Sequence, residues 1–396
     1  MTTQTQSLPA TAGRATLPAA RNWPRLAAYA GIAGAAGLAV LLPTGTAGAG
    51  WFLAGQVLNV NGSRVYPVRV RAHAGRRITL TRTPDTARSI PLSFVWAAGH
   101  ARLGEVISVD RATVTREVAE ITRGSLTAGV RGYTSSYVFE GDPRTARGLP
   151  FDEVVVDGEL GPLPAWLVPP TDGPADDTWI IAVHGRGAPR GEVLRALPTL
   201  AASGHRTLVV SYRNDVDAPP SPDHRFHLGH TEWRDVLSAV EHARSSGARD
   251  IILAGWSMGG AAILNLLRDW EHGGFLRAVV LDCPVVDWNE TLRMNARQLG
   301  VPPVWTWTAL KLIQHRLGVT SADLDYRSLA PRLDVPTLLY VDHDDRTVAP
   351  APTVELAQLA GDHVTLVETR EAGHCRSWNL DPQAYEQHLT KFLKSV

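Results

Sequence analysis

The spacing of apolar and polar residues divides the chain into parts of different character. An apolar run without charged residues extends from Leu26 to Ser63. From residue 65 to about 120 apolar and polar positions alternate, as in "RRITLTRT", and this alternation predicts short strands of a small β-rich subdomain. After about Phe151, continuous apolar runs such as "TWIIAVHG" alternate with segments of helical spacing.

Residues 151–396 predict an α/β fold with a mostly parallel central sheet flanked by helices. Near-continuous apolar strands are typical of parallel sheets that helices cover on both faces. A strand pair with a Gly-Pro turn is predicted for "FDEVVVDGELGPLPAWLVPP", and a short cap for about 284–334. Functional residues of such sheets lie at the carboxyl ends of strands. The other predicted strands are "HRTLVVSYR", "DIILAG", "LRAVVLDCPV", "PTLLYVDHDD" and "HVTLVET".

The apolar run near the amino terminus allows three interpretations. We favour a single transmembrane anchor over residues 26–58, with the amino terminus inside, because arginines precede the run. A cleaved signal peptide is the first alternative, since Ala47 and Ala49 provide small residues after an apolar core. A buried helix hairpin is the second alternative. The anchor and the signal peptide both place the later residues outside the cytoplasm.

Composition adds few constraints. Residues 1–25 are rich in Thr, Ala, Pro and Gln, a composition that predicts a disordered tail. The β-rich subdomain is assigned to residues 59–150, between the predicted anchor and the α/β part. Lysine plus arginine and aspartate plus glutamate number 39 each, so no overall charge recruits nucleic acid. Cys283 and Cys375 are the only cysteines. Two free thiols are the favoured interpretation, with a single bridge left open.

A serine between two glycines is the first candidate for chemistry. Gly255-Trp256-Ser257-Met258-Gly259 has the form G-x-S-x-G and lies between a predicted strand and a predicted helix. In that context the serine occupies a strained turn, and side chains at Gly255 or Gly259 would collide with neighbouring elements. We therefore predict Ser257 as a nucleophile.

A serine hydroxyl needs a base to take its proton. His374, in "EAGHCRSWN", follows the last predicted strand and precedes the last helix, and we predict it as the general base. The acid that orients the imidazole is expected in "YVDHDDRTVAP". Asp345 is our choice, because it is furthest from the strand end, with Asp344 second and Asp282 a further alternative.

An acyl-transfer site also needs two donors for the oxyanion. The N–H of Met258, directly after the nucleophile, and the N–H of Arg186, in "HGRG", are the predicted pair. His184 is interpreted as a structural histidine of that loop. The Arg186 side chain is expected to face water rather than a substrate anion.

Two further groups have a structural and a functional interpretation. The histidines of "HRFHLGH" fit no standard zinc spacing, so a polar loop is favoured over a metal site. Tryptophans in the cap either line an apolar pocket over the serine or pack against the sheet, and the second is favoured. They are Trp288, Trp305 and Trp307.

These motifs together resemble the α/β-hydrolase family. The resemblance covers about residues 151–396 and rests on "HGRG", "GWSMGG", "DDRTV" and "AGHCRSWN", in that order. "SYRNDVDAPPSPD" is similar to the prolyl-oligopeptidase-like and acyl-ester-hydrolase branch. The resemblance implies a triad of Ser257, Asp345 and His374. The chain departs from the pattern at "VDHDD", where many members carry His-Gly before the acid loop.

The expected activity is hydrolysis of a carboxylic ester, or a related acyl bond, through an acyl-enzyme on Ser257. No metal or organic cofactor is required, and the expected partner is a small or lipid-like acyl substrate. Peptide cleavage and acyl transfer to an alcohol are alternatives with the same triad. A non-enzymatic, membrane-tethered binding protein is the alternative from another class.

Overall fold

The computed structural model describes residues 45–60, 65–173 and 175–396. Residues 68–135 form a closed barrel with strand order β1-β2-β5-β4-β3-β6, hereafter the barrel domain. Period-two burial builds it: in β2, Ile78 and Leu80 point into the core while Arg77 is exposed. Its strands are β1 (Val68–Ala74), β2 (Arg77–Thr81), β3 (Leu92–Trp96), β4 (Gly99–Val109), β5 (Thr113–Arg123) and β6 (Arg131–Ser135).

The remaining strands form an eight-stranded sheet with the order β14-β13-β12-β11-β9-β10-β8-β7. Neighbours from β14 to β10 run parallel, whereas β8 pairs antiparallel with β10 and β7 antiparallel with β8. The predicted mostly parallel sheet and its opening strand pair are confirmed. The strands are β7 (Asp152–Gly158), β8 (Gly161–Val168), β9 (Thr178–Val183), β10 (Arg206–Val210), β11 (Asp250–Trp256), β12 (Leu276–Asp282), β13 (Thr337–Asp342) and β14 (Val364–Thr369).

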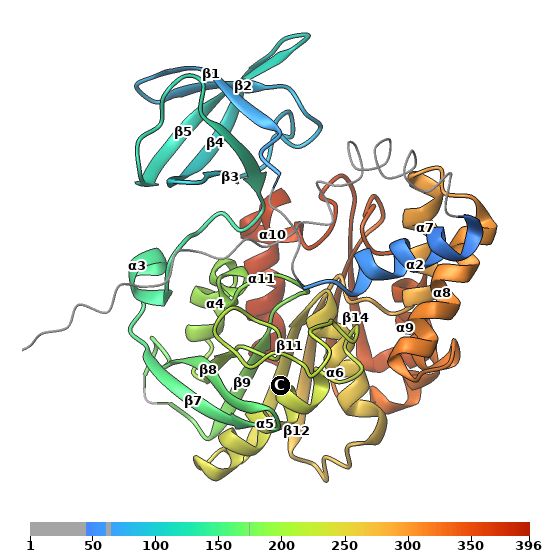
Figure 1. Ribbon diagram of the computed structural model, residues 1–396. Coiled ribbons are helices and arrows are strands. Elements are labelled where there is room, and N and C mark those ends of the chain that lie inside the picture. Colours follow the sequence, from blue (N-terminus) through green and yellow to red (C-terminus); the bar gives the residue numbers. More distant parts are fainter. Residues whose placement is uncertain (1–44, 61–64, 174) are drawn as a thin grey trace, which may run out of the picture.

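Helices cover both faces of this sheet (Figure 1). Buried apolar residues of α5, α6 and α9 pack on one face, and those of α4 and α11 pack on the other. Because β9 and β13 are buried along their whole length, and β11 and β12 at all positions but one, these strands appear as the continuous apolar runs seen in the sequence. These helices are α4 (Leu197–Ala201), α5 (Trp233–Ser245), α6 (Met258–Asp269), α9 (Ala351–Ala360) and α11 (Pro382–Leu393).

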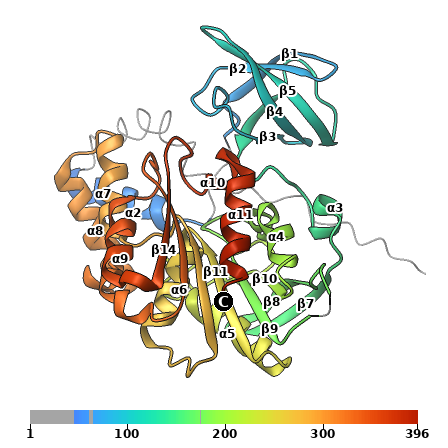
Figure 2. The ribbon, with the colours of Figure 1, turned by 180° about the vertical axis from the view of Figure 1, so that it is seen from behind.

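Shorter elements surround this three-layer core. The barrel domain lies beside α10, and α2 lies beside α7 and α8, in both views of the molecule (Figures 1 and 2). Trp288 of α7 packs in the core, whereas Trp307 of α8 is exposed. The elements are α2 (Gly45–Leu58), α3 (Pro143–Arg147), the 3-10 helix η1 (Arg190–Arg195), α7 (Trp288–Gln298), α8 (Pro303–Leu317) and α10 (Ser377–Leu380).

The predicted anchor over residues 26–58 is described only in its second half. There the chain forms α2, whose Ala54 and Leu58 are fully buried in the apolar core on one face of the eight-stranded sheet. Among the described residues, no helix combines the length and the hydropathy that crossing a bilayer demands. The apolar residues of 45–58 therefore pack against the core of the same chain. Composition alone does not distinguish a segment that faces lipid from one that faces a protein core. Residues 26–44, and the predicted tail 1–25, lie outside the described residues.

Candidate active site

Ser257 lies on a tight turn between β11 and α6. Its backbone angles, φ 52° and ψ −116°, are those of a strained conformation for a residue with a side chain. Such strain costs about 1–3 kcal/mol and persists only where the surroundings enforce it. One restraint is the hydrogen bond that the Ser257 N–H donates to the Asp282 carbonyl oxygen, at 3.0 Å.

The two glycines that flank this turn have no room for a side chain. A Cβ atom on Gly259 would lie 2.2 Å from the Val183 carbonyl oxygen of β9. A Cβ atom on Gly255 would lie 2.7 Å from the main-chain nitrogen of Gly260. Contacts under 3.0 Å force something to shift, and here the obstacle is backbone. The glycines therefore permit the close approach of α6 to the sheet that presents Ser257.

The structure brings Ser257, His374 and Asp345 into one hydrogen-bonded chain. His374 Nε2 lies 2.8 Å from Ser257 Oγ, and His374 Nδ1 lies 2.7 Å from Asp345 Oδ2. The other carboxylate oxygen of Asp345 accepts the N–H groups of Thr347, 2.7 Å, and Val348, 3.0 Å. Asp345 is therefore held in place and retains one oxygen for the imidazole.

The two alternative acids, Asp344 and Asp282, and the neighbouring Asp342 have different partners. Asp342 accepts the N–H groups of Ala372 and Gly373, both at 3.0 Å, and so shapes the loop that carries His374. Asp344 accepts the Glu371 N–H at 2.9 Å in the same loop. Asp282 is buried under Tyr385, whose hydroxyl donates to it at 3.0 Å. Among the aspartates considered from sequence, Asp345 is the one that contacts His374.

The surroundings of His374 favour its charged form. Burial by itself lowers the pKa of this imidazole, but the charge and hydrogen bond of Asp345, together with nearby carboxylates, outweigh burial and raise the pKa above its ordinary value of 6.5. The negative charges of Glu192 and Asp282 act in the same direction. An imidazole in this setting is well suited to receive a proton from Ser257.

The "HGRG" loop after β9 runs directly against the nucleophile. A Cβ atom on Gly185 would lie 3.0 Å from Ser257 Cβ. His184 braces the loop from inside: Nε2 lies 2.8 Å from Asp215 Oδ2, and its ring stacks on Tyr212 with centroids 4.5 Å apart. Burial lowers the pKa of His184, but Asp215, the hydrogen bond with the Gly185 carbonyl oxygen and the charge of Glu192 together raise it above its ordinary value. These contacts agree with a structural histidine.

The main-chain N–H groups of the two predicted oxyanion donors, Arg186 and Met258, differ from that of Gly185 in their hydrogen bonding. Gly185 donates its N–H to Glu192 Oε2 at 2.6 Å, so that group is occupied. Within residues 45–60, 65–173 and 175–396, no hydrogen bond engages the N–H of Arg186 or of Met258. Met258 also begins α6, where the helix dipole favours negative charge. Both groups thus remain the predicted oxyanion donors.

The guanidinium of Arg186 contacts protein groups and is only partly exposed, which corrects the expectation that it faces water. Its guanidinium donates to the Val57 carbonyl oxygen near the end of α2 and lies 5.4 Å from the centre of the Phe226 ring. Burial lowers the pKa of Arg186 to about 10. The Arg186 side chain therefore connects the "HGRG" loop to α2. The two segments are 129 residues apart, so the local sequence pattern does not predict this contact.

The barrel domain contacts the loop that carries His374. Arg376 forms an ion pair with Asp85 at 2.8 Å, and Arg88 Nη1 donates to the Ala372 carbonyl oxygen at 2.9 Å. Asn379 Nδ2 donates to the Pro91 carbonyl oxygen at 2.8 Å. The sequence analysis left the barrel domain without a role and did not find these residues.

The barrel side of this contact is itself rigidly held. Arg116 is fully buried and donates to the carbonyl oxygens of Ile90 at 2.6 Å and Arg88 at 2.8 Å. Burial lowers the pKa of Arg116 to about 10. Since these carbonyls belong to the segment that bears Asp85, the barrel presents a fixed surface to the histidine loop.

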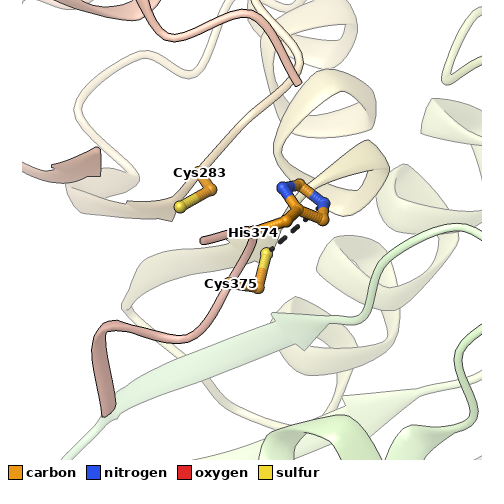
Figure 3. A group of neighbouring side chains, drawn as sticks. All are labelled: Cys283, His374 and Cys375. Carbon is orange, nitrogen blue, oxygen red and sulfur yellow. Dashed lines mark hydrogen bonds between the residues drawn. The ribbon is translucent and has the colours of Figure 1, made fainter. Parts of the chain in front are cut away.

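The two cysteines lie next to His374 (Figure 3). Both are free and buried, and Cys375 Sγ lies 3.7 Å from His374 Nε2. Burial raises the pKa of Cys375 well above its ordinary range. The pKa of Cys283 is raised to about 11, since burial and the negative charge of Asp282 outweigh its hydrogen bond to Cys375. The thiols are therefore protonated at neutral pH and are poor nucleophiles.

The histidines of "HRFHLGH" do not form a common metal site in the described part of the chain. His227 Nε2 lies 3.1 Å from Asp223 Oδ1, and His230 is half-buried. In the described part of the chain, the group whose ligand atoms converge closely enough for a metal ion is Cys283, His374 and Cys375 instead.

Family comparisons agree with the two-part architecture. The model of the "Alpha/beta hydrolase family" matches residues 180–388, more than half of the chain. A second model, "Domain of unknown function (DUF8805)", matches residues 69–135, which is the barrel domain.

Individual relatives are distant. The uncharacterized protein YfhR of Escherichia coli K12 is 26% identical over 152 residues, 38% of this chain and 51% of YfhR, so the chain spans about half the length of that relative. The esterase Pf2001 of Pyrococcus furiosus superposes with a TM-score of 0.52 at 18% identity, over 65% of this chain and 95% of that chain. In another crystal form of Pf2001 the TM-score is 0.51 at 17% identity, over 65% of this chain and 94% of that chain. At these identities the structural similarity concerns the fold alone.

Proposed function

Because the chain belongs to the alpha/beta hydrolase family, we propose that it is a serine hydrolase that cleaves carboxylic esters through an acyl-enzyme on Ser257. One observation carries the proposal: the uninterrupted path Ser257 Oγ, His374 Nε2, His374 Nδ1, Asp345 Oδ2, with separations of 2.8 and 2.7 Å. A continuous proton path of this kind turns a weak serine nucleophile into an effective one.

The proposed reaction has two halves. His374 takes the proton of Ser257 as its oxygen attacks the ester carbonyl, and the developing oxyanion accepts the N–H groups of Met258 and Arg186. The alcohol leaves with the proton from His374, and an acyl-enzyme remains. Water then attacks the acyl group with His374 again as base, which releases the acid and restores Ser257. No step calls on a metal or an organic cofactor.

A small or lipid-like ester is the proposed substrate class. The structure of similar fold from P. furiosus is that of an esterase, which makes carboxylic esters the first substrates to test. Peptides and acyl transfer to an added alcohol are the competing outcomes of the same assay. We further propose that residues 26–44, the part of the apolar run before α2, direct the hydrolase to the membrane, with the catalytic part outside the cytoplasm. Fractionation of cells that express the full chain tests that location.

The experiment for the activity uses a fluorophosphonate probe and p-nitrophenyl esters of graded acyl length on the full chain. We expect labelling and turnover in the natural protein and neither in Ser257→Ala. Truncation should not extend past residue 44, because the buried Ala54 and Leu58 of α2 belong to the core. Folded protein that fails to label with the probe would contradict the proposal.

A further inference from the structure

Three metal-ligating atoms gather beside the nucleophile. The two thiol sulfurs of Cys283 and Cys375 and a ring nitrogen of His374 all lie within 4.8 Å of one another (Figure 3). They come from two segments, the end of β12 and the loop after β14. Serine hydrolysis uses His374 but has no task for either thiol. The cluster is therefore not accounted for by the proposed reaction.

The separations are close to those of a zinc site. With zinc–sulfur bonds of about 2.3 Å and zinc–nitrogen bonds of about 2.0–2.1 Å, tetrahedral geometry places two sulfurs about 3.8 Å apart and sulfur and nitrogen about 3.6 Å apart. Cys375 Sγ already lies 3.7 Å from His374 Nε2, and the largest separation is at most 4.8 Å. Binding thus requires no pair of these atoms to close by more than about 1.2 Å.

The donor set selects a class of cation. Two thiols and an imidazole suit soft or borderline ions such as zinc and cadmium, whereas magnesium and calcium prefer oxygen. Binding would replace the two thiol protons with the metal. Negative charges of Asp345 and Glu192 act on His374 and favour an added positive charge there. We propose that Cys283, Cys375 and His374 form a site for a zinc-like cation whose occupancy switches off the hydrolase.

Zinc bound to either ring nitrogen of His374 would stop serine catalysis. Zinc on Nε2 takes the lone pair that must receive the Ser257 proton, and zinc on Nδ1 displaces Asp345. The fourth zinc position is left for water or for Ser257 Oγ, which lies 2.8 Å from Nε2. Metal binding and serine catalysis therefore exclude each other. This regulatory role rests on the proposed serine hydrolase function, whereas metal binding does not.

The experiment measures binding and activity separately on the full chain, with a reducing agent present. Zinc is titrated against a chromophoric chelator, and cobalt replaces it for spectroscopy. We expect one equivalent of zinc, a thiolate-to-cobalt charge-transfer band, and ester hydrolysis that zinc abolishes and EDTA restores. Magnesium should have no effect. Cys283→Ser and Cys375→Ser should each weaken zinc binding at least about tenfold.

Three controls separate the possible failures. His388→Ala removes an exposed histidine of α11 and should bind zinc as the natural protein does. Ser257→Ala should keep the zinc equivalent while lacking turnover, so the site is testable even if the hydrolase proposal fails. Circular dichroism and melting curves show whether each cysteine variant folds, and the cobalt band of the unmodified chain tests the thiols without any variant. Zinc affinity unchanged in both cysteine variants, or bound zinc with full activity, would overturn the proposal.

Discussion

Breaking the ion pair between Arg376 and Asp85 tests whether the barrel domain positions the catalytic histidine. Arg376 lies two residues after His374, and its guanidinium meets the Asp85 carboxylate at 2.8 and 3.3 Å. The two side chains are 13% and 35% exposed, so solvent screens the pair only in part. A pair of this kind is worth about 1 kcal/mol. If that energy holds the loop in its active arrangement, Arg376→Ala should lower kcat/KM about fivefold.

The assay is a double-mutant cycle on Asp85→Ala and Arg376→Ala, read as kcat/KM for ester hydrolysis. Positioning predicts a coupling of about 1 kcal/mol in transition-state free energy, with KM changed less than kcat. Arg76→Ala is the matched control, because Arg76 pairs with Glu117 at 2.7 Å within the barrel domain and not across to the histidine loop. That variant should hydrolyse esters at the normal rate. Zero coupling, or equal losses in Arg76→Ala and Arg376→Ala, would refute the reasoning.

Three further predictions address the site itself. Asp345→Asn should lower kcat/KM by several powers of ten, because the imidazole loses its orientation. Since the raised pKa of His374 depends on Asp345, and the base must be neutral, the acid limb of the pH–rate profile should lie above pH 6.5 and move to lower pH in this variant. Gly259→Ala should destabilise the fold by about 3 kcal/mol or more, measured by urea unfolding, because its Cβ would lie 2.2 Å from Val183 O. Arg186→Ala should lower activity and speed proteolysis within α2, since the guanidinium links α2 to the "HGRG" loop.

The candidate site could be predicted from sequence because a parallel sheet brings the loops after its strands to one edge. Strand ends of one sheet meet at one edge, so residues in the loops after β11, β13 and β14 were expected together. The structure has Ser257, Asp345 and His374 at those places and in contact. The choice among neighbouring aspartates was weaker from sequence, because one residue along a loop changes which carboxylate faces the imidazole. The contact between His374 Nδ1 and Asp345 Oδ2 decides it, while Asp342 accepts the N–H groups of Ala372 and Gly373.

The features that sequence analysis missed all depend on contacts between distant segments. The apolar run at residues 45–58 has the composition of a membrane segment, but its partner in the structure is the protein core. The alternating pattern before residue 120 predicted strands without indicating that they close into a barrel. Closure depends on β1 meeting β6, a pairing between the first and last strands of the domain. Periodicity describes each strand and carries no information on such pairings.

The barrel domain contributes contacts that hold the loop carrying His374. A general base on a loop keeps its geometry only if other groups hold that loop, because irregular backbone has few restraints of its own. Asp342 holds the loop from the sheet, and Arg195 donates to the Cys375 carbonyl oxygen at 2.6 Å from η1. Arg88 and Asp85 hold it from the barrel. Because the barrel contacts flank His374 on both sides in sequence, displacement of the barrel should move the base relative to Ser257, which couples the position of one domain to the chemistry of the other.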